Sequence, residues 1–405
     1  MQGKNILFGV TGSIAAFKTA GWVHSLVGEE AQVTVIMTNS ATRFISPLTF
    51  AALSGHQVHT TMFGEGEDEV MAHIGLPGEA DAVLIAPATA QTIARLAQGL
   101  AEDLLSSAVL ACSVPVVVCP AMNSKMLSHP ATQRNLAILR ELGYTVVVPE
   151  CGRLACGKSG TGRLPEWDTV REILLKVLTK PDLTGKNVLI TAGPTREPLD
   201  PARYLSNRSS GKMGYALART AVRRGATVTL ISGPVALAPP SGMTVVPVQT
   251  ALEMAEAVSW YAADASIVVM AAAVSDFRPT TVANQKIKKT TAEPLLDLSV
   301  NPDILAALGE KKQDNQLLVG FAAESKDHEQ EGVRKLKSKQ VDMMVVNDIL
   351  GKKTGFDVDT NQVILITPER TEQLELLSKE KTAHRIWDRV IPLLAAKEIT
   401  NNGTE

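Results

Sequence analysis

GKNVLITAGPTREPLDPARYLSNRSSGKMGYALAR, residues 185–219, is the stretch that decides how the second half of this chain folds. The apolar run 187–191 predicts a buried strand, and residues 215–219 begin a helix pattern. A connection inside an α/β unit usually needs about two to six residues. Segment 193–214 is far longer and holds three arginines, Asn207 and a Ser-Ser-Gly step, so we interpret it as a binding loop. An extended solvated loop is the alternative.

The first five residues of this stretch have a close counterpart near the start of the chain. GKNIL at residues 3–7 returns as GKNVL at residues 185–189, and each copy starts a run of alternating strand and helix patterns. Segment 178–185, LTKPDLTG, has the composition of a short linker. We therefore expect two domains, residues 1–184 and 185–405, both of the α/β class with a doubly wound, Rossmann-like parallel sheet.

The predicted strands are apolar and rich in β-branched residues, with little polar alternation, which is typical of strands buried on both faces. In the first half they lie at about 5–10, 32–38, 82–86, 115–119 and 144–148, with helices at Ser13–Gly28, Pro47–Ser54, Ala90–Gly99 and Pro130–Leu142. In the second half the strands lie near 187–191, 226–231, 243–248, 266–271, 317–321, 342–346 and 362–366, with helices near 211–224, 251–263, 328–339 and 378–395.

The composition is that of an ordinary globular protein. The chain has 405 residues, a net charge of −2 and four cysteines, which favours neither a nucleic-acid partner, nor a membrane surface, nor a disulfide framework. The longest apolar runs fall well short of the roughly 18 residues of a membrane span. Cys151 and Cys156 are spaced C-x4-C without a second pair, a poor pattern for structural zinc. We expect a cytoplasmic protein.

A candidate phosphate site follows the first strand, at Gly12 and Ser13. A helix that starts there offers its N-terminus to an anion. Because G-x-G-x-x-G is absent, a mononucleotide such as FMN fits better than a dinucleotide. Segments 38–40, 86–90 and 120–123 end three further strands with polar or special residues. Each alone is explained by capping or turn chemistry, but together on one sheet edge they favour a site.

His73 and Cys156 are the candidate reactive groups of the first half. A lone His is usually a surface or satisfied core residue, and Cys156 has the alternative of being an ordinary thiol in a flexible loop. However, the segment around Cys156 carries four glycines within a dozen residues, starting at Gly152. This pattern favours a mobile flap that carries one reactive group.

Two motif sets resemble known families. Residues 120–126, PAMNSKM, are similar to the P-x-M-N-x-x-M motif of the FMN-dependent cysteine decarboxylases, and Ala155-Cys156-Gly157 with Gly160–Arg163 is similar to their substrate flap. Segment 193–214 resembles the phosphopantothenate–cysteine ligases. From end to end the chain resembles the bacterial bifunctional coenzyme A biosynthesis proteins, in which the two enzymes are fused. Leu127 and Gln91 depart from the residues of many relatives.

For the first half the resemblance implies a flavodoxin-like FMN domain that decarboxylates 4′-phosphopantothenoylcysteine to 4′-phosphopantetheine. The family's flavin oxidises the substrate thiol to a thioaldehyde, which then delocalises the electrons left by carbon dioxide. Cys156 would supply a proton, His73 would give acid–base or electrostatic help, and Asn123 would hydrogen bond the substrate carboxylate. The implied FMN-binding residues are Gly12, Ser13, Thr38, Ala88, Thr89 and Ser106.

The second half offers cations and strand-end groups for an activated-carboxylate reaction. Asp276 follows a strand, the basic run 286–289 lies in an irregular segment, and Lys335 to Lys339 cluster further on. A solvated surface is the plain alternative for both basic groups. A P-loop motif is absent, so a P-loop ATPase is unsupported. Ser210-Gly211-Lys212 at a helix start is a plausible phosphate seat.

The resemblance assigns this half a ligase that joins cysteine to 4′-phosphopantothenate through an acyl-cytidylate made from CTP. Lys286 would stabilise charge as the cytidylate forms, and Asn207 would hold that intermediate. Mg²⁺ is implied by the triphosphate, with its ligands unknown. The implied nucleotide-binding residues are Met270, Ala271, Ala272, Asp276, Lys286, Pro302, Asp303, Ile304, Leu305, Phe321, Lys335 and Lys339.

By resemblance we expect a homo-oligomer, with trimers of the first domain and dimers of the second. Two other functions stay open at this point. A non-catalytic flavin-binding regulatory protein would bind FMN without releasing carbon dioxide from phosphopantothenoylcysteine. A nicotinamide or flavin oxidoreductase would transfer electrons to an acceptor and be indifferent to CTP.

Overall fold

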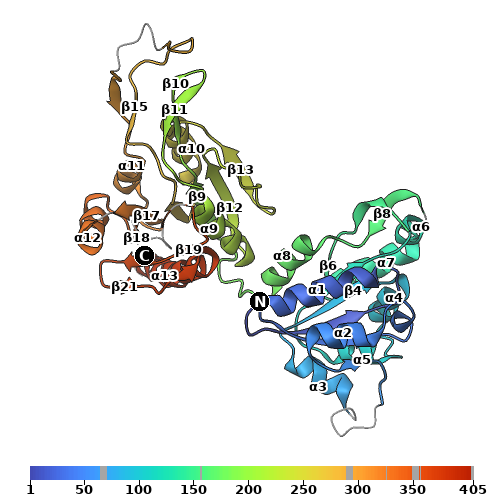
Figure 1. Ribbon diagram of the computed structural model, residues 1–405. Helices are drawn as coiled ribbons and strands as arrows, with labels where there is room; N and C mark the ends of the chain where they lie inside the picture. The colour runs from blue at the N-terminus through green and yellow to red at the C-terminus, as the bar shows by residue number, and fades with distance from the viewer. Residues whose placement is uncertain are drawn as a thin grey trace. The chain divides into compact units, whose positions relative to one another are not determined.

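The chain forms two compact units, Met1–Thr179 and Lys180–Glu405 (Figure 1). The computed structural model describes residues 1–63, 71–155, 157–288, 295–324, 326–348, 355 and 357–402. The division along the chain falls between residues 179 and 180, a few residues before the boundary that the sequence predicts between residues 184 and 185.

The first unit is built on a six-stranded parallel sheet in the order β3-β2-β1-β4-β5-β6. This is the Rossmann order, and it becomes the flavodoxin order when the two-residue edge strand β3 is left out. The strands are β1 (Asn5–Val10), β2 (Gln32–Met37), β3 (Val58–His59), β4 (Ala82–Ala88), β5 (Val116–Pro120) and β6 (Thr145–Val146). The helices are α1 (Ala16–Gly28), η1 (Ala41–Arg43), α2 (Pro47–Ser54), α3 (Ala72–Glu79), α4 (Ala90–Gln98), α5 (Leu104–Ala111), α6 (Ser124–Ser128), α7 (Pro130–Glu141) and α8 (Trp167–Val177).

Helices cover both faces of this sheet, and the strand residues divide between two cores. Ile6, Phe8 and Val10 of β1 belong to one core, whereas Leu7 belongs to the other. Alternate residues of a strand point to opposite faces, so a strand that is apolar throughout serves both. Trp22 of α1 packs against Trp167 of α8, with ring centroids 5.5 Å apart.

The second unit repeats the plan on an eight-stranded sheet in the order β13-β12-β9-β14-β17-β18-β20-β21. The first six strands in this list are parallel and follow the Rossmann order. At the end of the sheet, β20 pairs antiparallel with β18, and β21 pairs antiparallel with β20. The strands are β9 (Asn187–Ala192), β12 (Thr227–Ser232), β13 (Thr244–Pro247), β14 (Ile267–Met270), β17 (Leu317–Glu324), β18 (Met343–Asp348), β20 (Val363–Ile366) and β21 (Thr371–Gln373). The helices are α9 (Lys212–Arg223), α10 (Ala251–Ala262), α11 (Ile304–Lys311), α12 (His328–Ser338) and α13 (Lys379–Asn402).

Short antiparallel strand pairs lie outside the two main sheets. In the first unit β7 pairs with β8, and in the second unit β10 pairs with β11, β15 with β16, and β19 with β22. Their bounds are β7 (Glu150–Arg153), β8 (Ser159–Arg163), β10 (Arg196–Asp200), β11 (Arg203–Ser206), β15 (Phe277–Pro279), β16 (Leu298–Val300), β19 (Thr360–Asn361) and β22 (Leu377–Ser378).

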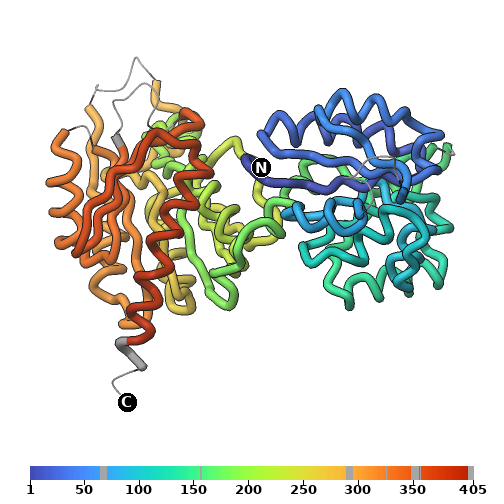
Figure 2. Tube along the Cα trace, turned by 90° about the horizontal axis from the view of Figure 1, so that it is seen from below, coloured from blue at the N-terminus to red at the C-terminus, as the bar shows by residue number. Residues whose placement is uncertain are grey.

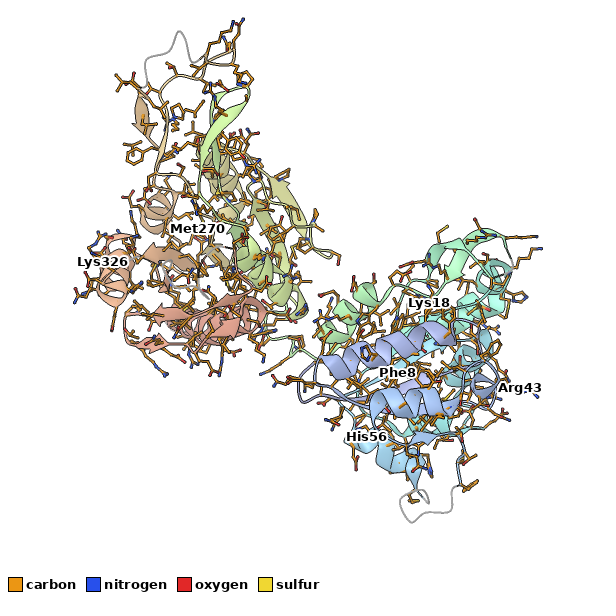
Figure 3. All side chains as sticks on the ribbon, viewed as in Figure 1. Phe8, Lys18, Arg43, His56, Met270 and Lys326 are labelled. Atoms are coloured by element: carbon orange, nitrogen blue, oxygen red, sulfur yellow. The ribbon has the colours of Figure 1, made fainter. Side chains whose placement is uncertain are left out.

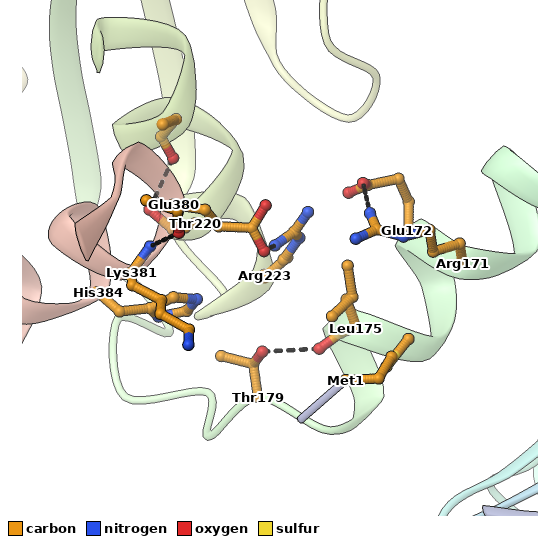
Figure 4. Close-up of polar contacts among 12 residues, drawn as sticks. Met1, Arg171, Glu172, Leu175, Thr179, Thr220, Arg223, Glu380, Lys381 and His384 are labelled. Atoms are coloured by element: carbon orange, nitrogen blue, oxygen red, sulfur yellow. Dashed lines mark hydrogen bonds and ion pairs between the residues drawn. The ribbon is translucent and has the colours of Figure 1, made fainter. Parts of the chain in front are cut away.

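The C-terminal helix α13, red in Figure 2, is fixed to α9 and its C-cap by a buried indole and by the ion pairs Arg223–Glu380 and Arg224–Asp388. Trp387 is fully buried, and its Nε1–H donates to Thr220 Oγ1 at 2.9 Å and to the Leu217 carbonyl at 3.2 Å. Arg223 donates to Glu380 Oε1 at 2.6 Å (Figure 4). This helix therefore closes the core on one face of the second sheet.

The predicted fold class is confirmed, with three local differences. Helix α1 begins at Ala16 rather than Ser13, because residues 13–15 form a turn. The expected binding loop 193–214 contains the β10–β11 hairpin. The glycine-rich segment expected as a flap forms the β7–β8 hairpin.

Candidate functional site

At the carboxyl edge of the first sheet, Thr11 ties the end of β1 to the end of β4. Its hydroxyl donates to the Pro87 carbonyl at 2.5 Å and accepts from the Thr89 N–H at 3.1 Å. Gly12 follows, and a Cβ there would lie 2.4 Å from Ser40 Cβ. Only glycine lets these two strand-end turns approach so closely.

A cavity of about 670 Å³ opens beside this edge. Its lining includes Ser13 from the turn before α1 and Asn123 from the N-cap of α6, so the structure brings these two predicted residues together. Asn123 Oδ1 accepts from the Lys125 N–H at 2.9 Å. Apolar walls come from Ile14, Phe17, Met122, Leu154 and Leu164.

The β7–β8 hairpin packs against the segment that carries Asn123. Gly162 has φ +124°, its carbonyl accepts from the Met122 N–H at 2.9 Å, and a Cβ on it would lie 2.2 Å from the Met122 carbonyl oxygen. A Cβ on Gly160 would lie 2.4 Å from Ser124 Oγ. Glycine is therefore required at Gly162, whereas a side chain at Gly160 would displace the Ser124 hydroxyl, and the close contact makes the hairpin one wall of the cavity.

The charged residues that line this cavity are all cations: Lys18, Arg153 and Arg163. Lys18 lies on α1 (Figure 3), and its Nζ is 3.6 Å from Glu166 Oε1, a carboxylate that also pairs with Arg163. Cations with amide and hydroxyl donors beside apolar walls suit a ligand that is part apolar and part anionic.

The other predicted residues of this half do not line the cavity. Thr38 Oγ1 accepts from the Ala41 N–H at 3.3 Å, Thr89 caps α4, and Ala88 is buried in β4. Ser106 is buried, and its hydroxyl forms a capping box with Asp103 at the start of α5. These contacts give Thr38, Thr89 and Ser106 local structural partners.

His73 and Cys156 are placed differently by the structure. His73 lies in the first turn of α3, outside the cavity lining, and its buried Nδ1 has no hydrogen-bond partner among the described residues. Cys156 lies outside the described residues. Its neighbours in sequence, Ala155 and Gly157, line the cavity.

In the second unit the site forms where the strand order reverses, between β9 and β14. The loop after β14 is joined by hydrogen bonds to the end of β9 and to the loop that follows it: the Ala272 N–H donates to Thr191 Oγ1 at 3.1 Å and the Ser275 N–H donates to Thr195 Oγ1 at 3.0 Å. In open α/β sheets, ligands bind in the crevice at this reversal.

A narrow pocket of about 90 Å³ lies here, at the N-terminus of α9. Gly211, the N-cap, has φ +75°, and a Cβ on Gly214 would lie 2.5 Å from Ala192 Cβ. The lining also includes three predicted nucleotide residues, Ala271, Ala272 and Phe321. Met270, labelled in Figure 3, is buried at the end of β14 just before them.

Two lysines line this pocket. Lys212 Nζ donates to Asp359 Oδ1 at 2.8 Å, which raises the pKa of Lys212. Lys379 is buried and donates to the Val358 carbonyl at 2.5 Å and the Gly355 carbonyl at 3.2 Å. Burial, together with the nearby Lys212, lowers the pKa of Lys379 to about 8. A pocket with two ammonium groups at a helix N-terminus favours a polyanion.

Asn207 lines a second cavity, of about 380 Å³. This cavity shares Ser209, Ser210 and Lys212 with the narrow pocket, so the two adjoin. The Asn207 side chain donates to the Ala273 carbonyl at 3.0 Å. Asn207 is thereby held beside the loop after β14.

A third group of predicted residues surrounds the start of α11. Asp303 caps this helix and pairs with Lys339, while Lys335 Nζ lies 2.6 Å from Glu324 Oε1. Burial raises the pKa of Asp303, but Lys339 and the Ala306 N–H outweigh it and hold that pKa below its usual value. Pro302, Ile304 and Leu305 belong to the same helix start.

The structure does not bring Lys286 or Asp276 into the pocket lining. Asp276 is exposed, just before β15. Lys286 is exposed beside the turn of the β10–β11 hairpin, whereas Asn207 follows the other end of that hairpin. A strand rises about 3.3 Å per residue, so the five-residue β10 separates the two ends by roughly 15 Å.

Sequence reasoning did not assign Lys379, Asn347 or Asn361 to the second site, or Lys18 and Arg153 to the first, although all five line these pockets. Lys379 is 167 residues from Lys212 in sequence, and no local pattern connects them. Among the described residues, no three His, Cys, Asp or Glu side chains are grouped so as to hold a metal ion. No helix in the described ranges is both long and apolar enough to cross a lipid bilayer.

Comparison with known proteins gives matches to both units. The family described as "Flavoprotein" matches residues 1–179, and the family described as "DNA/pantothenate metabolism flavoprotein C-terminal domain" matches residues 183–393. The chain is 44% identical over 398 residues to the "Coenzyme A biosynthesis bifunctional protein CoaBC" of Bacillus subtilis (strain 168), covering 97% of this chain and 98% of the relative. It is 43% identical over 409 residues to the protein of that name from Mycobacterium tuberculosis (strain ATCC 25618 / H37Rv), covering 97% of each.

A solved structure is also similar to part of the chain. It is titled "Crystal structure of the C-terminal Domain of Coenzyme A biosynthesis bifunctional protein CoaBC" and is 40% identical, with a TM-score of 0.47. It covers 54% of this chain and 100% of its own.

Proposed function

This chain belongs to the family of coenzyme A biosynthesis bifunctional proteins CoaBC, and from that premise we propose which half performs each reaction and with which residues. The chain is an enzyme of coenzyme A biosynthesis with a ligase and a decarboxylase activity. The ligase, residues 185–405, would join cysteine to 4′-phosphopantothenate with CTP. The decarboxylase, residues 1–184, would convert the product to 4′-phosphopantetheine. The observation that carries the partition is that each motif set lies at the carboxyl edge of its own parallel sheet.

The cavity of the first unit fits FMN by the chemistry of its lining. Ile14, Phe17 and Met122 offer apolar contact to an aromatic ring system, while Ser13 and Lys18 offer a hydroxyl and an ammonium group to a phosphate. The implied contacts of Gly12, Thr38, Ala88, Thr89 and Ser106 stay predictions. When bound, the flavin would supply the reversible oxidation of the substrate thiol that makes decarboxylation possible.

The protein's own residues would bind and orient the substrate there. Asn123, held at the N-cap of α6, would hydrogen bond the departing carboxylate, and Arg153 and Arg163 would offset its charge and that of the substrate phosphate. The β7–β8 hairpin would exclude water and hold Cys156 as the proton donor. His73 would act as an acid–base or electrostatic group.

In the second unit, the α9 N-terminus with Lys212 and Lys379 supports binding of a triphosphate. CTP would contact the loop after β14 and the group around Asp303, Lys335 and Lys339. Asn207 would hold the acyl-cytidylate for attack by the amine of cysteine, and Lys286 would stabilise the charge that develops as pyrophosphate leaves. Mg²⁺ would arrive bound to the triphosphate.

We propose a homo-oligomer in the cytoplasm, with trimers of the first unit and dimers of the second, and exposed apolar side chains support self-association. Tyr204, Phe277, Leu298 and Val300 are exposed on the two hairpins of the second unit. A dimer through these hairpins would also offer Lys286 of one copy a pocket on the other. On the first unit Ile14, Phe17 and Leu48 are among the exposed apolar residues.

The test is to follow both reactions on one preparation. We expect pyrophosphate from CTP only with 4′-phosphopantothenate, and carbon dioxide from phosphopantothenoylcysteine without CTP. Asn207→Asp should lower the first rate and leave the second unchanged, and Asn123→Asp should do the reverse. Equal losses in both rates from either variant would contradict the partition. Carbon dioxide released at full rate by protein stripped of flavin would refute the flavin-dependent route.

A further inference from the structure

The carboxylate of Asp200 lies at the turn of the β10–β11 hairpin, and its two oxygens have different partners. The residue is 4% exposed. Oδ1 accepts from the N–H groups of Ala202 at 2.8 Å and Arg203 at 3.0 Å, which closes the turn. Oδ2 accepts from Arg203 Nε at 2.9 Å and from the Ile287 N–H at 3.1 Å. Both oxygens thus bind the hairpin, and Oδ2 also reaches a segment more than 80 residues away in sequence.

Both backbone polar groups of Ile287 are held in this way. Arg203 Nη2 pairs with Asp200 and also donates to the Ile287 carbonyl at 2.8 Å. Four residues earlier, the Ala283 N–H donates to the Leu199 carbonyl at 3.0 Å. The segment that contains Lys286 is therefore fixed to the hairpin on both sides of that residue.

The Asp200 carboxylate stays ionised at neutral pH. The Arg203 guanidinium, supported by the N–H groups of Ala202 and Ile287, holds the pKa of the Asp200 carboxyl well below its usual value. Charge-assisted hydrogen bonds of this kind are stronger than neutral ones. The contact with Ile287 is therefore a persistent attachment.

We propose that Asp200 is a positioning residue for the ligase reaction, which fixes the backbone of Lys286 through the peptide group of Ile287. The inference rests on the proposed function, because it takes Lys286 as the residue that stabilises charge during cytidylate formation. The Lys286 side chain is exposed and has four rotatable bonds, so the placement of its ammonium group depends on a fixed backbone. A displacement of about 1 Å in a catalytic arrangement costs roughly a hundredfold in rate.

The alternative is that Asp200 only stabilises the hairpin. Asp200→Asn separates the two roles, because an amide offers one oxygen for two sets of N–H donors and carries no charge for Arg203. With its oxygen on the Ala202 and Arg203 N–H groups, Asn closes the turn and presents N–H groups to Ile287 and to the Arg203 guanidinium. Asp264→Asn is the matched control, since Asp264 is exposed and lies in another part of the same unit.

The experiment is a double-mutant cycle read by single-turnover pyrophosphate release, with CTP and 4′-phosphopantothenate and without cysteine. The full-length chain is used, and its carbon dioxide release from phosphopantothenoylcysteine verifies that each variant is folded and active. We expect Asp200→Asn to slow pyrophosphate release by about tenfold to a hundredfold in the parent chain. In the Lys286→Gln background it should change the rate by less than about twofold.

Equal losses from Asp200→Asn in the two backgrounds would overturn the positioning role, because the effect would then not pass through Lys286. An unchanged rate in the parent chain would overturn it as well. If Lys286→Gln itself left pyrophosphate release unchanged, the proposed role of Lys286 would fail, and the role of Asp200 with it. The three results are distinct, so the inference fails separately from the proposed function.

Discussion

Gly162→Ala tests whether the contact between the β7–β8 hairpin and the Met122–Asn123 segment serves decarboxylation. The glycine has φ +124°, a conformation that residues with a Cβ rarely adopt, and the added carbon would lie 2.2 Å from the Met122 carbonyl oxygen. An ordinary carbon–oxygen contact is about 3.2 Å or longer. Alanine therefore forces the hairpin and this segment apart by about 1 Å.

This displacement sets the expected magnitude. The strained backbone costs about 1–3 kcal/mol locally, which the first unit absorbs by shifting the hairpin. A shift of about 1 Å at a wall of the cavity that Asn123 lines should lower kcat/KM for decarboxylation by roughly a hundredfold, close to 2.7 kcal/mol of transition-state stabilisation. Flavin content should stay near the parent value, because Ser13, in the turn before α1, and Lys18, on α1, lie outside the displaced segments.

The assay is carbon dioxide release from phosphopantothenoylcysteine, with CTP-dependent pyrophosphate release on the same sample as the measure of an intact second unit. Gly152→Ala is the matched control. Gly152 lies on the other strand of the hairpin, and an added Cβ would meet only the Arg163 side chain, at 3.4 Å or more. A decarboxylation rate for Gly162→Ala within about threefold of the Gly152→Ala rate would refute the reasoning.

Three further predictions follow from the described contacts. Trp387→Phe removes the indole donor to Thr220. It should lower the free energy of unfolding of the second unit by about 1–3 kcal/mol, as measured by denaturant titration. An unfolding midpoint equal to that of the parent would contradict this prediction. Lys379, with a pKa of about 8, is protonated below that pH and neutral above it, so the KM for CTP should rise between pH 7.5 and 9.5. Lys379→Arg should flatten that rise, and an identical pH profile in the variant would count against the lysine. Lys18→Met should raise the KM for phosphopantothenoylcysteine or weaken FMN binding by about tenfold. Steady-state kinetics measures the first effect and flavin titration the second. No change in either quantity would exclude a contact between Lys18 and an anionic ligand.

The parallel sheets were predictable because their signal is local. Runs such as Val188–Ile190 are apolar and buried, and helix patterns separate them, so the order of strands and helices follows from the sequence. The β10–β11 hairpin was not predicted, because Arg196–Asp200 contains proline and charged residues where an alternating strand pattern is expected. Its pairing is instead stabilised by partners that lie elsewhere in the sequence, such as Ile287.

The candidate sites also contain residues that the sequence could predict and residues that it could not. Ser13 and Asn123 come together because each directly follows a strand of one parallel sheet, and carboxyl ends of such strands share an edge. Lys379 has no comparable signal, because it is the first residue of an ordinary helix and reaches the pocket only through the fold. The proposed roles of Cys156 and His73 rest on resemblance, and so does that of Lys286, which the Lys286→Gln variant tests.

The four tryptophans make each half of the chain separately visible by fluorescence. Trp22 and Trp167 pack against each other at a tilt of 37° within the first unit, whereas Trp387 is enclosed in the second and Trp260 faces solvent there with 78% of its surface exposed. Replacing Trp260 and Trp387 by phenylalanine leaves a chain whose emission reports only on the flavoprotein half. The converse pair of replacements leaves an emission that shifts to longer wavelength only when the C-terminal half opens.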